Sequence, residues 1–133
     1  KAHIEGFYYK PRIDRELLKK YREGIICLSA CLGGEIPQAI MNKTAEEAEQ
    51  IAIEYQTIFG EDFYLELMRH RTDDPGMNKL VFDDQVFVNR TLLGLGQKLG
   101  IKCVATNDVH FVNMEDAEAH DHLICLNNSE TSR

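Results

Sequence analysis

The stretch Cys-Val-Ala-Thr-Asn-Asp-Val-His-Phe at residues 103–111 joins a short apolar run to a carboxylate and an imidazole. The run at residues 103–105 follows a glycine and contains small and branched side chains, which predicts a buried strand. Asp108 and His110 come just after this strand, and they lie on one side of it if the backbone stays extended. Carboxylate and imidazole ligands together are typical of a divalent metal site. A simple turn is the alternative, because Asn and Asp are common turn residues.

Length and composition are those of an ordinary globular chain. The 133 residues suit one domain or a piece of a larger one, and 44% hydrophobic with 28% charged residues are usual values. No apolar run is long enough to span a membrane, and the first residues lack the apolar core of a signal peptide. The first residue is not Met, so we expect the chain to be cut from a longer protein. Because no export signal is visible, we expect a reducing cytoplasm and no disulfides.

The net charge of −7 and a pI near 5.2 make the chain acidic. Nucleic-acid-binding surfaces are usually basic, so this charge does not point to DNA or RNA binding by the chain itself. The four cysteines form no Cys-x-x-Cys pair, which argues against a structural zinc finger. Cys27, Cys103 and Cys125 lie in apolar sequence and are expected to be buried small side chains.

A second apolar run, at residues 25–30, is followed directly by Cys31 and then by the pair Gly33 and Gly34. The run is continuous and lies between chain breakers, which predicts a strand buried on both faces, as in a parallel sheet. A thiol at the end of such a strand, beside a flexible glycine pair, is a second candidate metal ligand. A buried structural cysteine is the alternative.

Amphipathic helices and short strands alternate along the whole chain. Besides the two apolar runs, we expect a helix capped by Asp14, a helix at residues 35–41, a helix capped by Thr44, a strand at residues 63–68, a helix at residues 80–99 and a last helix capped by Asn113. This order predicts an α/β fold with a parallel sheet. Functional sites of such folds gather at the carboxyl ends of the strands, where Cys31, Asp108 and His110 all fall.

Three other features leave alternatives open. Residues 1–13 are expected to be irregular, and their segment at residues 6–12, aromatic and then basic, either contacts a nucleic acid or anchors on a neighbouring core. Glu66 is expected to be exposed or paired, although it could also belong to a site. His120 and His122 lie about 200° apart on a helix, which makes them a poor chelating pair.

Four motifs together are characteristic of one protein family. They are Glu-Gly-Phe-Tyr-Tyr-Lys-Pro-Arg-Ile-Asp at residues 5–14, Leu-Ser-Ala-Cys-Leu-Gly-Gly-Glu-Ile-Pro at residues 28–37, Ala-Thr-Asn-Asp-Val-His-Phe at residues 105–111 and Ala-Glu-Ala-His-Asp at residues 117–121. In this order they closely resemble the PHP (polymerase and histidinol phosphatase) domain of bacterial DNA polymerase III alpha subunits. The similarity extends over nearly the whole chain.

The resemblance implies part of a distorted (β/α)₇ barrel that holds up to three divalent metal ions, with Zn, Mn and Fe as the candidates. In this family the ligands are mostly His and acidic residues, with a Cys in the polymerase branch. By motif, Cys31 corresponds to the Cys of Ser-Ala-Cys, and Asp108 and His110 to the final Asp-x-His pair. The family's His-x-His motif and its other ligands would lie upstream of Lys1, and the polymerase carboxylates lie in other domains. We therefore expect residues 1–133 to be one partial PHP domain that neither polymerises DNA nor holds a complete metal cluster alone.

Three functions follow from the resemblance as expectations. The first is a fragment of a DNA-directed DNA polymerase whose PHP site supports metal-dependent 3′–5′ exonuclease activity. The second is an inactive PHP scaffold that stabilises the polymerase and binds its proofreading subunit. The third, a stand-alone phosphoesterase, fits the segment at residues 6–12 less well. Expected partners of the longer protein are DNA, the proofreading exonuclease subunit and the sliding clamp, with no membrane contact. The isolated chain is expected to self-associate through open sheet edges.

Overall fold

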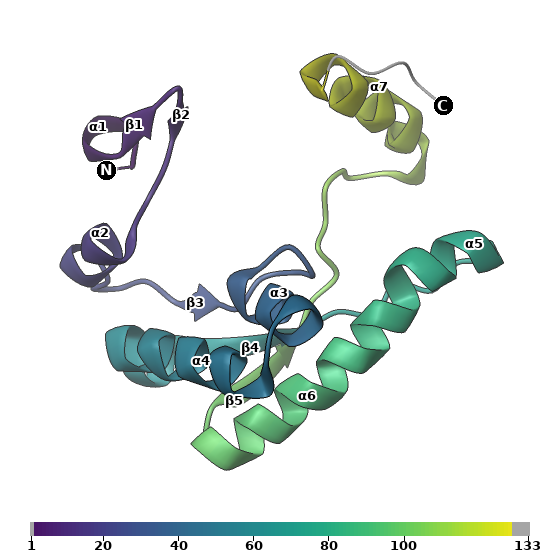
Figure 1. The fold of residues 1–133 in the computed structure, drawn as a ribbon. Helices are drawn as coiled ribbons and strands as arrows, with labels where there is room; N and C mark the ends of the chain where they lie inside the picture. The colour runs from purple at the N-terminus through teal and green to yellow at the C-terminus, as the bar shows by residue number, and fades with distance from the viewer. Residues whose placement is uncertain (1, 129–133) are drawn as a thin grey trace.

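A parallel three-stranded sheet lies at the centre of the computed structural model, which describes residues 2–128 and the side chains of residues 2–126 (Figure 1). Its strands are β3 (Cys27–Leu28), β4 (Phe63–Leu67) and β5 (Lys102–Ala105), in the order β3-β4-β5. Cys27 pairs with Phe63, and Leu65 pairs with Cys103. Parallel strands in sequential order need a crossover connection between each pair, and helices supply both. The predicted parallel α/β fold is confirmed, whereas a closed barrel is not seen in the described residues.

Helices α3 (Glu35–Asn42) and α4 (Ala45–Phe59), with the short η1 (Gly60–Asp62), connect β3 to β4. The connection from β4 to β5 is one helical run, made of α5 (Pro75–Met77), a π-helical turn η2 (Asn78–Phe82) and α6 (Asp83–Leu99). It begins five residues before the predicted helix, because the Asp74 side chain accepts hydrogen bonds from the N–H groups of Gly76 and Met77. Gly100 ends α6 with a φ of +68°, a conformation that suits glycine.

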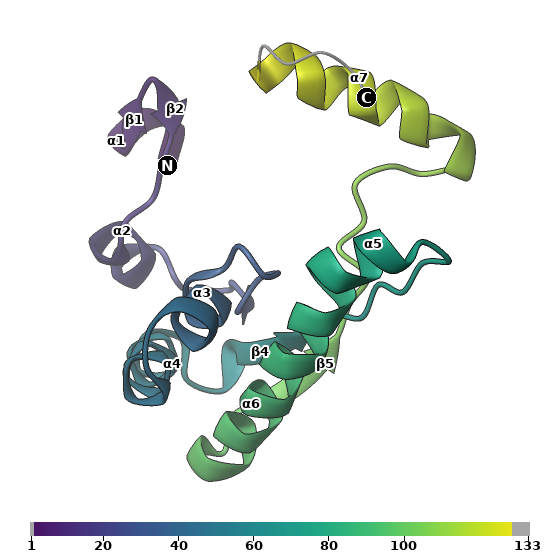
Figure 2. The same cartoon turned by 45° about the vertical axis from the view of Figure 1, so that its right-hand side comes forward.

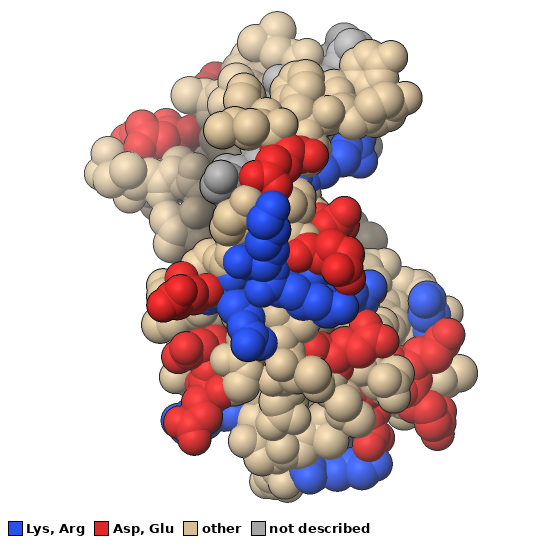
Figure 3. Space-filling view, turned by 90° about the vertical axis from the view of Figure 1, so that its left-hand side faces the viewer, with Lys and Arg blue, Asp and Glu red and all other residues tan. Residues whose placement is uncertain are grey.

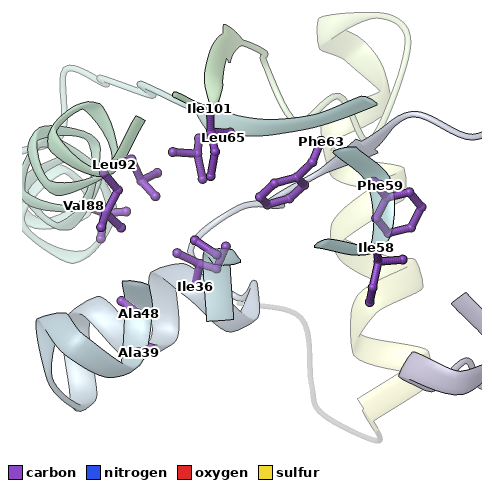
Figure 4. Close-up of a cluster of buried hydrophobic side chains, with 12 residues drawn as sticks. Ile36, Ala39, Ala48, Ile58, Phe59, Phe63, Leu65, Val88, Leu92 and Ile101 are labelled. Carbon is purple, nitrogen blue, oxygen red and sulfur yellow. The ribbon is translucent and has the colours of Figure 1, made fainter. Parts of the chain in front are cut away.

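The hydrophobic core lies between one face of the sheet and the helices α3, α4 and α6. Phe63 and Leu65 point from β4 toward Ile36 of α3 and Leu92 of α6, as Figure 4 shows. Because Phe63 and Leu65 share one face of β4, all three helices cover that face. Leu65 and Leu92 are fully buried, and the remaining buried members are Ile36, Ala39, Ala48, Ala52, Ile58, Phe59, Phe63, Val88, Leu95 and Ile101.

The opposite face of the sheet is only partly covered. Leu28 and Tyr64 pair on this face, and Leu28 is exposed while Tyr64 is half-buried. Lys102 and Val104 extend the face onto β5, where Lys102 is exposed. The sheet therefore buries one face well and leaves the other open to further packing.

Both apolar runs form strands, but neither strand is buried as predicted. Only Cys27 and Leu28 of the run at residues 25–30 are in a strand, and Ile26 is 65% exposed. In β5, Cys103 and Ala105 are exposed. The physical reason is position, since β3 and β5 are the two edges of the described sheet. The expectation that Cys103 is buried is likewise wrong, and Cys27 and Cys125 are half-buried.

Two terminal arms extend away from the sheet and its helices (Figures 1 and 2). The N-terminal arm contains α1 (Ala2–Glu5), β1 (Phe7–Tyr8), β2 (Lys10–Pro11) and α2 (Arg15–Lys20), and the C-terminal arm contains η3 (Met114–Asp116) and α7 (Ala117–Asn128). β1 and β2 pair antiparallel, so the expectation of an irregular start is wrong. Apolar side chains in both arms are exposed, including Tyr9 at 83% and Val112 at 91%. No helix among the described residues is long and apolar enough to cross a membrane.

Candidate functional site

Polar side chains tie the carboxyl ends of all three parallel strands together. Ser29, directly after β3, accepts a hydrogen bond through Oγ from the N–H of Glu66 at 2.8 Å. Thr106, directly after β5, donates from Oγ1 to Glu66 Oε1 at 2.6 Å. Glu66 is 9% exposed, so this carboxylate is buried and paired. The prediction that Glu66 is exposed or paired is confirmed by its bond to Thr106. Together Ser29, Glu66 and Thr106 connect the carboxyl ends of the three strands.

Cys31 lies at the same carboxyl end of the sheet, in the loop between β3 and α3. It is half-buried, and its carbonyl accepts from the Gly34 N–H at 2.8 Å. A Cβ on Gly34 would lie 2.4 Å from the Ser29 carbonyl oxygen, so only glycine fits. Ala30 has a φ of +66°, which is unfavourable for a residue with a Cβ. The loop is therefore a tight turn that presents the Cys31 thiol just past the strand end.

Asp108 and His110 lie in the exposed segment that follows β5. Asp108 has a φ of +48°, so the backbone is not extended here. The prediction that Asp108 and His110 lie on one side of an extended strand is therefore wrong. Instead the chain turns, and His110 Nδ1 lies 2.6 Å from the Asp108 carbonyl oxygen. A carbonyl only accepts, so Nδ1 donates in this contact, and Nε2 is the ring nitrogen left for a ligand. Histidines that bind metals commonly donate their other ring N–H in this way.

The structure places the three predicted ligands at the carboxyl end of the sheet but does not assemble them into a cluster. β4 separates β3 from β5, and neighbouring strands are spaced so that the two outer ones lie about 10 Å apart. Among residues 2–128, no group of three or more His, Cys, Asp or Glu side chains is close enough to hold a metal ion. The donor atoms of Cys31, Asp108 and His110 suit a divalent metal, and on their own they make part of a site.

Two histidines that the sequence analysis did not assign contact this region. His120 of α7 packs on His110 with ring centroids 5.6 Å apart, and also on Phe111. His70, which follows β4, lies 2.9 Å through Nε2 from the Asn107 carbonyl oxygen. The contact of His70 joins residues 37 positions apart, so no local sequence signal marks it. His120 lies in the motif at residues 117–121, but residue spacing does not predict its contact with His110. His122 faces its own helix, with Nδ1 2.8 Å from the Glu118 carbonyl oxygen.

A separate polar cluster joins α2 to the helices that cover the sheet. Arg15 forms ion pairs with Glu35 at 2.7 Å and with Glu54 at 3.1 Å. The Tyr55 hydroxyl donates to Glu35, and burial together with that carboxylate raises the pKa of Tyr55. Burial also raises the pKa of the Cys27 thiol. On the face of the molecule in Figure 3, a group of adjoining Lys and Arg side chains lies at the centre and is bordered by Asp and Glu side chains.

Comparison with known families decides what kind of domain this is. The sequence model of the PHP domain matches residues 1–70. The chain belongs to the PHP domain family. The match contains Cys31 and ends at His70, so Asp108 and His110 of this PHP chain lie beyond it.

Individual relatives extend the similarity over nearly the whole PHP chain. The DNA polymerase III subunit alpha of Borreliella burgdorferi is 44% identical over 125 residues, which are 94% of this chain and 10% of that protein. The proteins of the same name from Treponema pallidum and Thermus aquaticus are 42% and 41% identical over 95% and 98% of this chain, again with 10% of each relative covered. The chain thus spans about a tenth of the length of the curated relatives that it matches.

Proposed function

We propose that this chain is part of the alpha subunit of a bacterial replicative DNA polymerase, a DNA-directed nucleotidyltransferase, and contributes one side of a PHP metal site. The observation that carries the proposal is the similarity to DNA polymerase III alpha subunits over nearly all of the chain. The convergence of Cys31, Asp108 and His110 at the carboxyl edge of one parallel sheet supports the metal site.

The architecture supports part of a (β/α)₇ barrel as the finer fold. Three parallel strands in sequential order with helices on one face are what a segment of such a barrel contains. The partly exposed face with Leu28, Tyr64 and Val104 would then be the inner face, which further strands would cover. The remaining metal ligands would come from the segment upstream of this chain.

The chemistry proposed for the complete site is hydrolysis of a phosphodiester bond, as in a 3′–5′ exonuclease. A divalent ion, Zn, Mn or Fe, would lower the pKa of bound water and stabilise charge on the phosphate oxygens. His110 would bind it through Nε2, since Nδ1–H is already donated to the Asp108 carbonyl. The Asp108 carboxylate would supply oxygen ligands, and Cys31 would bind as a thiolate.

An inactive scaffold is the second candidate function. The lack of a three-ligand cluster within residues 2–128 is compatible with it, although a partial metal site would show the same lack. The exposed apolar side chains of both arms also suit a domain that packs against other parts of a polymerase. In either case DNA, the proofreading exonuclease subunit and the sliding clamp are proposed as partners of the whole protein, acting in the cytoplasm.

The two candidates differ in what Asp108 does in the intact polymerase. For the metal site, Asp108→Asn should abolish hydrolysis of single-stranded DNA from its 3′ end while DNA synthesis continues. The matched control is His122→Gln, because His122 faces its own helix. If His110→Ala leaves any nuclease activity unchanged but weakens folding of the polymerase, the scaffold is correct and the metal site is wrong.

An isolated copy of the chain is proposed to self-associate. β3 and β5 are the open edges of the sheet formed by residues 2–128, and Ile26 beside β3 is 65% exposed. Unpaired edges and exposed apolar surface promote pairing between chains. Light scattering should therefore give a mass above the 15.2 kDa of one chain, and a monomer at working concentration would contradict this.

A further inference from the structure

His70 is held by partners that fix the position of its proton. The backbone N–H of His70 donates to Gln85 Oε1 at 2.7 Å, which sets the orientation of the Gln85 amide. The amide nitrogen of Gln85 then lies 2.8 Å from His70 Nδ1. An amide nitrogen only donates, so Nδ1 accepts and carries no proton. The ring is therefore neutral and protonated at Nε2.

The Nε2–H of His70 points at the segment that carries the proposed metal ligands. It donates to the carbonyl oxygen of Asn107 at 2.9 Å. Both ring nitrogens are thus engaged, and neither has a lone pair left for a metal. Any effect of His70 on the site must act through Asn107, the residue directly before Asp108.

Helix α6 gives this contact a rigid base. Gln85 is 4% exposed and lies near the start of α6. One turn later, Asn89 donates from Nδ2 to the Met68 carbonyl at 2.8 Å, which ties α6 to the same strand end as His70. Two side chains of one helix therefore hold the backbone that follows β4, and His70 reaches from there to the loop after β5.

We propose that His70 is a positioning residue for Asp108 and His110, an inference that rests on the proposed metal role of that pair. The hydrogen bond from His70 fixes the carbonyl before Asp108, and the bond from His110 fixes the carbonyl of Asp108 itself. Between them Asp108 has a φ of +48°, in the left-handed region that residues with a Cβ adopt infrequently. His70 and His110 together hold the turn that sets the direction of both side chains.

Two substitutions separate the hydrogen bond to Asn107 from the packing of the ring. His70→Gln places an amide nitrogen at the ε position and can still donate to Asn107. His70→Asn places its amide at the δ position, where its oxygen can still accept from Gln85, and loses the donor to Asn107. Both remove the imidazole, so each is the control for the other.

The readout is backbone ¹⁵N relaxation of residues 107–110 in the full 133-residue chain, together with the ¹⁵N shifts of the His70 ring. We expect the protonated Nε2 form, order parameters of roughly 0.8 in the wild type and in His70→Gln, and values below about 0.6 in His70→Asn. Equal loosening in both variants, loosening in His70→Gln alone, no loosening in either, or a proton on Nδ1 would each overturn the proposal. The measurement needs no metal, so its failure is distinct from a failure of Asp108 to bind one.

Discussion

The packed centre, formed by the three-stranded sheet with α3, α4 and α6, contains apolar residues similar to those of the two arms. These side chains are buried in the centre and exposed in the arms. Leu65 and Leu92 of the centre are fully buried, whereas Tyr9 and Val112 of the arms are more than four-fifths exposed. Helix capping works equally well in both regions, since Thr44 caps α4 in the centre and Asp14 caps α2 in the N-terminal arm. Local structure is thus encoded in each region separately, but burial depends on partners that only the centre has within the described residues.

The candidate site lies where these two regions meet. Cys31 follows β3 on a turn that Gly34 makes possible, and Asp108 lies where the chain leaves β5 for the C-terminal arm. One side of the site therefore has the rigidity of the sheet edge, and the other depends on a few hydrogen bonds. Variants that affect one region alone would sharpen this comparison.

The largest expected effect is at the centre of the core. Leu65→Ala should lower the free energy of unfolding by about 2–5 kcal/mol, because it empties a fully buried position. The matched arm variant Val112→Ala should change it by less than about 0.5 kcal/mol. Urea unfolding followed by circular dichroism measures both, and equal losses would show that the two regions do not differ as described.

A smaller effect is expected in the loop that carries Cys31. Gly34→Ala places a Cβ against the Ser29 carbonyl and should cost about 1–3 kcal/mol of stability. Gly94→Ala is the control, because nothing lies within 4 Å of a Cβ there and alanine should stabilise α6 by up to about 1 kcal/mol. The same unfolding experiment tests this pair, and a Gly34→Ala protein as stable as the wild type would show that the turn is not tight.

The smallest effect concerns alkaline pH. Burial raises the pKa of Cys27 above its ordinary value of 9.0, so the folded state keeps a proton that the unfolded state loses. This contribution to stability is complete below pH 9 and is lost as pH rises through the higher pKa of the folded state. Cys27→Ala should therefore flatten the decline of stability above pH 9, as measured by urea unfolding at several pH values. An unchanged slope of stability against pH would contradict a raised pKa of Cys27.

The sequence predicted the elements well because their signals are local. Thr44 caps α4 by accepting from the Glu47 N–H, and Gly60 ends that helix with a φ of +60°. The same local reasoning placed Cys31, Asp108 and His110 past strand ends. Local reasoning could not predict which strands lie at the edges of the sheet. Edge position depends on how many strands the sheet has, not on the sequence of any single strand.

The details of the site depend on contacts that residue spacing does not predict. The turn at Asp108 replaces the extended backbone that alternation assumes, and it is held by His70 from a different loop. His120 reaches His110 only because α7 turns back after residue 113. Sequence spacing therefore identified the candidate ligands but not the side chains that orient them.

The most direct test of the account is elemental analysis of bound metal on this chain and on a chain extended upstream through the whole PHP domain. We predict divalent metal on the extended chain, its loss in Asp108→Ala, and its retention in the control His122→Ala. The short chain alone should bind little, because its described residues form no three-ligand cluster. Metal content that Asp108→Ala leaves unchanged, or no metal on either chain, would contradict the proposed site.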